Sequence, residues 1–298
     1  MNQPQLIELP RIFDPRGNLS FIQNGPLTGF DIQRCYWIYD VPGGQERHGH
    51  AFRTQSELIV ALAGSFDVVL DDGNGPVRYH MARSYYALRV PPMTWRSIDN
   101  FSTCSVAMVL SSTTYDPTDY IEDYDLFKTL AAAPNRPVPP LTTITQQETT
   151  TTPDIPGYHS RSSIERCGII DLPRHRHPNG SLSVVENIEG APFDIRRVFY
   201  LYDVPGDSER GGHSHHEARE LIVAVSGSFD VTLDDGHQRR VYSLNRPYKA
   251  LYVEPGIWRS LDNFSSGSVS LVLTSQLFDE ADYVRDYDRF KQLTATKV

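Results

Sequence analysis

The feature that most constrains this chain is an internal duplication at a fixed offset. The segment YDVPG at residues 39–43 reappears at residues 202–206, and GSFDV at residues 64–68 reappears at residues 227–231. Both pairs are 163 positions apart, since 202 − 39 = 163 and 227 − 64 = 163. About half of the aligned positions are identical. The chain therefore contains two copies of one domain.

The two copies are separated by a stretch rich in Pro and Thr. Residues 131–160 have no hydrophobic period, which predicts an extended linker. We therefore expect an N-terminal domain over residues 1–130 and a C-terminal domain over residues 161–298. A chain of 298 residues is long enough for two domains with a core each.

Each copy has the pattern of a β protein. Short β-branched runs such as ELIVAV (residues 220–225) and FDVTL (residues 229–233) are separated by turn signals such as Asp235-Gly236. Their spacing is typical of a sandwich or barrel. Helical patterns occur near the end of each copy, at residues 118–130 and 280–293. We expect an all-β fold.

Composition limits the classes of partner. The net charge of -9 argues against binding to nucleic acid or to a membrane surface, although a few local arginines could hold a small anion. Three widely spaced cysteines indicate neither a disulfide framework nor a metal site. Neither a signal peptide nor an apolar run of roughly 18 residues is evident, so we expect a cytoplasmic protein.

The second copy contains a His-x-His motif. Gly206, His213, His215, Glu220 and Gly227 follow one another at the spacing of the first cupin motif, which this segment resembles. Residues i and i+2 of a strand face one side, so both imidazoles should point the same way. The resemblance implies two tandem cupin domains, that is, jelly-roll β-barrels, each with a short C-terminal helix. In metal-binding cupins the two histidines and the glutamate are ligands.

The later cupin motif departs from a metal site. Arg259 stands where metal-binding cupins have their fourth ligand, a histidine. A guanidinium is always cationic and has no lone pair for a metal. We therefore predict no metal and no cofactor, and an acid–base pair at His213 and His215. The competing interpretation is a satisfied polar pair without chemistry.

The first copy lacks one of these histidines. Phe52 replaces the second histidine, and the other pair there, His48 and His50, is shifted by two positions. A phenylalanine cannot transfer protons. We expect the N-terminal domain to be catalytically degenerate, and to be kept for packing or for completing the other site.

Longer segments carry a more specific resemblance. The second copy contains IRRVFYLYDVPG (residues 195–206), LDDG (residues 233–236), GIWR (residues 256–259) and DYVRDYD (residues 282–288). Together with the His-x-His motif, these resemble the nucleotide-sugar 3,4-ketoisomerases, which act on dTDP-4-keto-6-deoxy-D-glucose. The resemblance covers nearly all of each copy. It implies a metal-free isomerase that moves the ketone from C4 to C3 in deoxyamino-sugar biosynthesis, for example for lipopolysaccharide.

The resemblance also implies roles for individual residues. His215 would be the base at C3, whose hydrogen the C4 ketone acidifies, and His213 its partner in a proton relay. Arg259 would contact the sugar oxygens, while Trp258 would stack on a ring or lie in the core. Arg197 and Arg210 are expected at the diphosphate. The full substrate-contacting set is Arg197, Arg210, Tyr200, Glu220, Trp258, Arg259 and Arg16.

One residue of that set belongs to the other copy. The first copy reads DPRG at residues 14–17, as family members often do, whereas the second reads HPNG at residues 177–180. The relatives are dimers that exchange N-terminal strands, and this chain resembles such a dimer fused into one polypeptide, a pseudo-dimer. If the exchange persists, Arg16 would lie near His215. The Trp258-Arg259 pair favours the gluco product.

Two other functions remain open from the sequence. One is a bicupin that binds nucleotide sugars without catalysis. The other is a metal-dependent bicupin oxygenase or isomerase that uses His213, His215 and Glu220.

Overall fold

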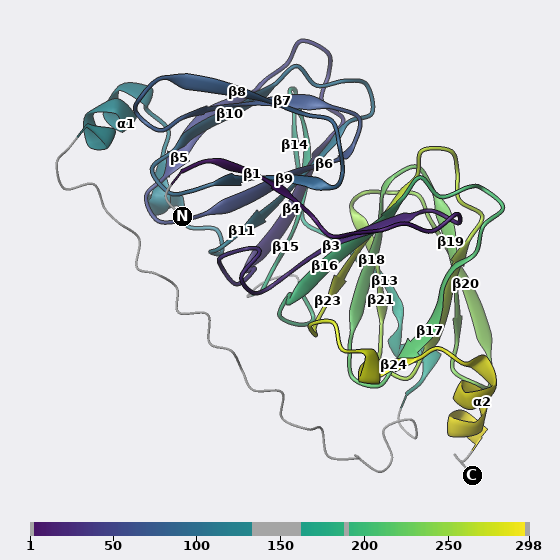
Figure 1. Cartoon of the computed structure of the whole chain (residues 1–298). Coiled ribbons are helices and arrows are strands. Elements are labelled where there is room, and N and C mark those ends of the chain that lie inside the picture. Colours follow the sequence, from purple (N-terminus) through teal and green to yellow (C-terminus); the bar gives the residue numbers. More distant parts are fainter. Residues whose placement is uncertain (1–2, 133–161, 188–190, 296–298) are drawn as a thin grey trace. The chain divides into compact units, whose positions relative to one another are not determined.

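The computed structural model describes residues 3–132, 162–187 and 191–295 (Figure 1). They form two compact units, one from the described parts of 1–11, 24–143 and 173–192, the other from those of 12–23, 144–172 and 193–298. The predicted linker at residues 131–160 lies outside the described residues except for its first two, of which Ala131 ends a helix. No helix within the described ranges is long and apolar enough to span a membrane.

The first unit consists of two antiparallel sheets. The seven-stranded sheet has the order β1 (Gln5–Glu8), β9 (Tyr86–Val90), β6 (Glu57–Ala63), β11 (Val106–Ser111), β4 (Arg34–Tyr39), β15 (Gly180–Glu186) and β14 (Arg174–His177). The five-stranded sheet has the order β12 (Tyr120–Ile121), β5 (Arg47–Phe52), β10 (Trp95–Asp99), β7 (Phe66–Asp71) and β8 (Pro76–Met81).

The second unit repeats this arrangement. Its seven-stranded sheet has the order β13 (Gly168–Asp171), β21 (Lys249–Val253), β18 (Glu220–Ser226), β23 (Val269–Thr274), β16 (Arg197–Tyr202), β3 (Asn18–Gln23) and β2 (Arg11–Ile12). Its five-stranded sheet has the order β20 (Arg239–Leu244), β19 (Phe229–Asp234), β22 (Trp258–Asp262), β17 (Arg210–His215) and β24 (Tyr283–Val284).

Alternation along the strands places the core of each unit between its sheets. Phe229, Val231 and Leu233 of β19 are buried in one cluster with Ile222 of β18 and Val272 of β23. Successive side chains of a strand point to opposite faces, so every second residue contributes to this core. The first unit has an equivalent cluster that includes Phe66, Val68, Leu70, Ile59 and Val109. The predicted all-β class and the two tandem barrels are confirmed.

Each unit incorporates a strand from the other sequence repeat. Strand β3, from the first repeat, pairs with β16 of the second, with Ser20 opposite Tyr200 (Figure 1). Strand β15, from the second repeat, pairs in the same way with β4 of the first. The exchange anticipated in the sequence is therefore present. The compact units differ from the sequence-based ranges 1–130 and 161–298 by these exchanged segments.

A glycine at the tip of the exchanged hairpin allows it to approach the second unit closely. Gly17 has a φ of +117°, a conformation that residues with a side chain rarely adopt. A Cβ at this position would lie 2.6 Å from Cγ2 of Val204. The hairpin therefore depends on glycine for both its backbone conformation and its packing.

The helices are short and follow the last strands. Within the described ranges they are α1 (Tyr124–Ala131) and α2 (Tyr287–Ala295), together with single 3-10 turns at η1 (Pro117–Asp119), η2 (Ile164–Arg166) and η3 (Glu280–Asp282). Asp123 caps α1, because its side chain accepts a hydrogen bond from the Leu126 N–H. Phe290 of α2 is fully buried and lies beside the Trp258 ring, so this helix covers one end of the five-stranded sheet.

Candidate active site

His213 and His215 lie together at the end of β17. Both side chains are buried, and their ring centroids are 4.9 Å apart. The pairing of β17 with β22 shifts register between Arg210 and His213, and this irregularity places His213 opposite Arg259. The two imidazoles therefore form one site, as the i, i+2 spacing predicts.

Beside the histidines, Glu220 and Arg259 form a buried ion pair. Nε and Nη2 of Arg259 each donate a hydrogen bond of 2.8 Å to a different carboxylate oxygen of Glu220. Burial by itself would raise the pKa of Glu220, but the Arg259 guanidinium and His215 hold it well below its usual range. Glu220 is therefore a carboxylate in the folded protein.

A glycine makes room for this guanidinium. Nη1 of Arg259 donates to the carbonyl oxygen of Gly211 at 3.2 Å. Gly211 has a φ of +70°, and a Cβ there would lie 2.0 Å from the same nitrogen. Arg259 is therefore held on two sides, by the glutamate and by the β17 backbone.

The donor atoms of His213, His215 and Glu220 are close enough to suggest a metal site. One ligand atom from each residue lies within 4.8 Å of the others. However, Arg259 bonds both oxygens of Glu220, so a divalent ion would have to displace a bidentate guanidinium. It would also have to stay beside a fixed positive charge. These residues therefore fit a metal poorly.

Asp282 orients the second histidine. Its Oδ2 accepts a hydrogen bond of 2.8 Å from Nδ1 of His215, and its Oδ1 accepts one of 2.6 Å from the Glu217 N–H. Nε2 on the other side of the ring lies 3.5 Å from Oε1 of Glu220. Because a carboxylate accepts at Nδ1, the proton of the neutral ring is at Nδ1 and its lone pair is at Nε2.

The surroundings shift the pKa values of the two histidines in opposite directions. Burial by itself would lower the pKa of His215, but hydrogen bonds to Asp282 and Glu220 raise it above its usual value. Burial, followed by the charge of Arg259 and the neighbouring His215, lowers the pKa of His213 well below its usual value. Such a pair can hold and release a proton at one member while the other stays neutral.

Tyr283 connects the histidine pair to Arg197, one of the two arginines predicted to contact the diphosphate. Its ring centroid lies 4.9 Å from that of His213 and 4.4 Å from that of His215. Nη1 and Nη2 of Arg197 donate to the Tyr283 hydroxyl at 3.2 and 3.1 Å. The Arg197 guanidinium also lies over the ring of Phe199. Arg197 therefore belongs to the site.

The exchanged β2–β3 hairpin contacts Arg210, the other arginine predicted to contact the diphosphate. Nη1 of Arg210 donates to the Gly17 carbonyl at 2.7 Å and lies 3.4 Å from Oδ2 of Asp14. The exposed Arg16 side chain donates to both oxygens of Asp14, at 3.1 and 2.8 Å. Asp14, Arg16 and Arg210 thus form one charged group contributed by both repeats.

Two residues predicted to contact the substrate, Tyr200 and Trp258, have surroundings of another kind. Tyr200 is fully buried, and alternation along β16 puts it on the opposite face from Arg197 and Phe199. Its expected contact with the substrate stays a prediction. The Trp258 ring packs against Tyr287 and Phe290 of α2, at centroid distances of 5.0 and 5.6 Å. These contacts favour the core interpretation of Trp258.

The first barrel has a different network at the equivalent place. Phe52 stands at the position of His215, and its ring contacts Tyr120 at a centroid distance of 4.5 Å. Glu57 still binds Arg96, at 2.9 Å, but it also accepts from the Tyr36 hydroxyl at 2.9 Å and from the Gln55 side chain at 3.2 Å. The Tyr36 hydroxyl and the Gln55 amide therefore occupy the side of Glu57 that is equivalent to the side of Glu220 facing His215.

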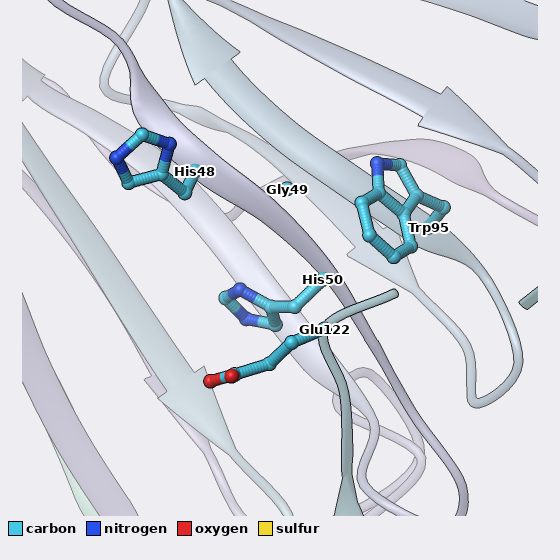
Figure 2. A pocket seen from close by; sticks show the side chains of 5 residues that line it. All are labelled: His48, Gly49, His50, Trp95 and Glu122. Carbon is cyan, nitrogen blue, oxygen red and sulfur yellow. The ribbon is translucent and has the colours of Figure 1, made fainter. Parts of the chain in front are cut away.

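Two cavities open beside the histidines of this first barrel. One has a volume of about 500 Å³ and is lined by His48, Gly49, His50, Trp95 and Glu122. Figure 2 shows the His48 and His50 rings on the same side of β5, with Trp95 on the other. The second, of about 390 Å³, shares both histidines and includes residues of the exchanged β14–β15 hairpin.

Two residues of the site, Asp282 and Tyr283, are not evident from the His-x-His motif, because they lie far from it in the chain. The one sequence signal for them is that the same Asp-Tyr pair occurs 163 positions earlier, at Asp119 and Tyr120. Only the pairing of β17 with β24, with His215 opposite Tyr283, brings these residues to the histidines.

The fold and the site together define a tandem cupin with a buried histidine pair and an arginine in place of a metal ligand. Comparison with known proteins is consistent with this class. Residues 2–132 and 165–295 each match the family described as FdtA: WxcM-like, C-terminal. The chain belongs to this family and contains it twice, as the sequence predicted.

Named relatives share one activity. The chain is 39% identical over 127 residues to the TDP-4-oxo-6-deoxy-alpha-D-glucose-3,4-oxoisomerase of Aneurinibacillus thermoaerophilus, covering 43% of this chain and 91% of that protein. The solved TDP-quinovose 3,4-ketoisomerase of Campylobacter jejuni is 40% identical, with 43% of this chain and 99% of that chain covered and a TM-score of 0.42. A sugar 3,4-ketoisomerase from Thermoanaerobacterium thermosaccharolyticum, solved with TDP, is 32% identical, covers 45% and 98%, and has a TM-score of 0.44.

Proposed function

We propose that the second barrel isomerises dTDP-4-keto-6-deoxy-D-glucose to its 3-keto isomer by proton transfer at a histidine pair, without a metal. The enzyme class, a sugar-nucleotide 3,4-ketoisomerase, rests on the family match and on the curated relative. The mechanism rests on one observation, the placement of His215 between Asp282 and Glu220 with His213 beside it.

Proton removal at C3 is the first step. The C4 ketone acidifies the C3 hydrogen, and the lone pair on Nε2 of His215 accepts it. The C3–H electrons form a C3–C4 double bond, and the electrons of the C4 carbonyl move to its oxygen. The imidazolium that forms is stabilised by the carboxylates of Asp282 and Glu220, 2.8 Å from Nδ1 and 3.5 Å from Nε2.

Proton return at C4 completes the isomerisation. The C3 hydroxyl loses its proton, the electrons of its O–H bond form the new C3 ketone, and those of the C3–C4 double bond take a proton from solvent at C4, whose oxygen becomes the hydroxyl. The proton removed from C3 leaves Nε2 of His215 for solvent, which restores the neutral base. His213, whose pKa is lowered by burial and by Arg259, stays neutral and can pass the hydroxyl proton between the two oxygens. Arg259 contributes a fixed positive charge beside the developing enediolate.

The remaining contacts concern the diphosphate. Arg210 and Arg197 are the candidates for its oxygens, and Arg16 is poised beside Arg210 through Asp14. The exchanged hairpin that carries Arg16 supports the interpretation of the chain as a fused pseudo-dimer. The gluco product follows from the same family pattern at Trp258 and Arg259.

Incubation with dTDP-4-keto-6-deoxyglucose in deuterated water tests this function. We expect deuterium at C4 of a 3-keto product by NMR, and we expect His215→Asn to lower the rate by roughly 10²–10⁴-fold. His80→Asn, at an exposed histidine bonded to Asp67, is the control for loss of an imidazole and should change nothing. Full activity of His215→Asn would refute the base assignment. TDP binding without any isomerisation would instead favour a binding bicupin, and stoichiometric bound metal in the active protein would favour the metal-dependent alternative.

A further inference from the structure

The two exchanged hairpins place differently charged side chains beside equivalent arginines of the two barrels. In the second barrel, Arg210 lies 3.4 Å from the carboxylate of Asp14. In the first barrel, the equivalent Arg47 donates to Oδ1 of Asn179 at 3.0 Å, and His177 stands at the position of Asp14. The first barrel therefore lacks both members of the Asp14–Arg16 ion pair, and its arginine faces a neutral amide instead of a carboxylate.

Among the described residues, Arg47 consequently has no acidic partner. Its hydrogen bonds within the described part of the chain go to the Asn179 side chain and to the carbonyl oxygens of Asn179 and Gly180, at 3.4 and 3.3 Å. Burial and the neighbouring Arg96 lower the pKa of its guanidinium. A partly buried cation facing another cation is stabilised by an anion between or beside them.

The cavity next to Arg47 is lined by basic groups. Its volume is about 390 Å³, within the range of small-molecule sites. No carboxylate is among its lining residues, which are Arg34, Tyr36, Ile38, Arg47, His48, His50, Arg96, Tyr120, His175, Arg176, His177, Asn179 and Leu182. Arg34 and Arg96 are ion-paired with Glu186 and Glu57, at 2.9 Å each, whereas the hydrogen bonds of Arg47 go to neutral groups of the described residues. The cavity therefore offers Arg47 and the basic side chains of the β14–β15 hairpin to an anion.

Two further features suit an organic anion over a simple ion. Nε2 of His50 is buried and has no hydrogen-bond partner among the described residues, so it is available to a ligand. Tyr120, Ile38 and Leu182 add aromatic and apolar surface beside the basic groups. A ligand with both phosphate oxygens and a ring would use both kinds of surface.

We propose that the first barrel is a second binding site, which holds a nucleoside diphosphate or its sugar ester without isomerising it. Arg47 and the histidines of the exchanged hairpin contact the diphosphate, and the apolar side of the cavity receives a ring. The site does not isomerise its ligand because Phe52 occupies the position of the base and because the Tyr36 hydroxyl and the Gln55 amide already donate to Glu57 beside it. This inference rests on the proposed function, because the ligand belongs to the same substrate class. The contacts of Arg47 that support it do not depend on the reaction.

Binding stoichiometry of the full chain tests the proposal. Isothermal titration with TDP should give two sites per chain for the wild type and one for Arg47→Met, with affinity at the altered site reduced by roughly 10-fold or more. Arg210→Met is the matched variant in the second barrel and should also leave one site. Titration with inorganic pyrophosphate distinguishes a phosphate site from a nucleotide site, because we expect it to bind the first barrel more weakly than TDP does.

A second variant keeps the test valid if Arg47→Met does not fold. Asn179→Asp places a carboxylate on Arg47 at a position that already makes a 3.0 Å hydrogen bond, and it should lose the first-barrel site. It also replaces the Nδ2–H that donates to the Glu46 carbonyl, at 2.9 Å, so its denaturant midpoint is compared with that of the wild type before titration. A single TDP site in the wild type that neither Arg47→Met nor Asn179→Asp affects would overturn the inference, and so would pyrophosphate binding as tight as TDP. Loss of isomerase activity with both TDP sites intact would overturn the proposed function and leave this inference standing.

Discussion

Oδ2 of Asp282 accepts a hydrogen bond of 2.8 Å from Nδ1 of His215, and the other oxygen of the same carboxylate is fixed by the Glu217 N–H. This contact orients the ring, sets its tautomer and raises its pKa. Asp282 is therefore a positioning residue for the proposed base, and its effect should be visible in the pH dependence of the reaction.

Asp282→Asn should shift the acidic limb of kcat/KM to lower pH. The neutral form of His215 is the base, so activity rises as its proton is lost, at a pKa above the usual 6.5 in the wild type. The amide removes the negative charge that stabilises the imidazolium, so this pKa falls. We also expect kcat to fall by roughly 10²-fold with little change in KM. Steady-state rates from pH 5 to 9 measure both effects.

The matched control is Asp119→Asn in the first barrel. Asp119 accepts from the backbone N–H groups of Thr54 and Gln55 in the same way, but Phe52 gives it no imidazole to orient. It should leave the pH profile unchanged. If Asp282→Asn moved the alkaline limb instead, His215 would act as the acid, and an unchanged profile would refute the positioning role.

Arg259→His should create a metal site in the second barrel. The substitution frees both oxygens of Glu220 and adds an imidazole to the donors of His213 and His215. After incubation with zinc or manganese and dialysis, we expect about one ion per chain by mass spectrometry, against a trace for the wild type.

Arg96→His is the control for this substitution. The first barrel offers His50 and Glu57 but has Phe52 in place of the third donor, so it should retain no ion. Equal metal content in the two variants, or a full complement in the wild type, would contradict the view that Arg259 excludes a metal.

Phe52→His alone should not activate the first barrel. The Tyr36 hydroxyl and the Gln55 amide already occupy the side of Glu57 that an imidazole would need, at 2.9 and 3.2 Å. In a His215→Asn background, Phe52→His should stay at the background rate, and Phe52→His with Tyr36→Phe should exceed it. Solvent deuterium entering the sugar measures each rate. Activity in the first of these variants would show that one substitution silenced this barrel.

Gly17→Ala should destabilise the second unit through its exchanged hairpin. The positive φ and the 2.6 Å approach to Val204 leave no room for a methyl group, which should cost about 1–3 kcal/mol. Gly43→Ala is the control, because nothing lies within 4 Å of a Cβ there and its φ is not in the positive region. Denaturant unfolding of the full chain compares them, and equal midpoints would count against the packing argument.

The sequence by itself determined the duplication, the β class, the family and the unequal histidine content of the copies. These properties depend on local patterns, such as the 163-residue offset, the alternation along β19, the i, i+2 spacing of His213 and His215 and the Phe at position 52. Each pattern can be recognised within a few residues of the chain, because strand geometry fixes which neighbours share a face.

The tertiary structure decided which distant residues surround those histidines. Asp282 reaches His215 only because β24 pairs with β17, and Asp14 reaches Arg210 only because the first repeat donates a hairpin to the second unit. The opposite pKa shifts of His213 and His215 likewise come from burial and from charges far away in the sequence. Contacts of this kind depend on strand order and exchange, which no local pattern specifies. For the same reason, only the structure shows that Tyr200 lies on the other face of β16 from Arg197.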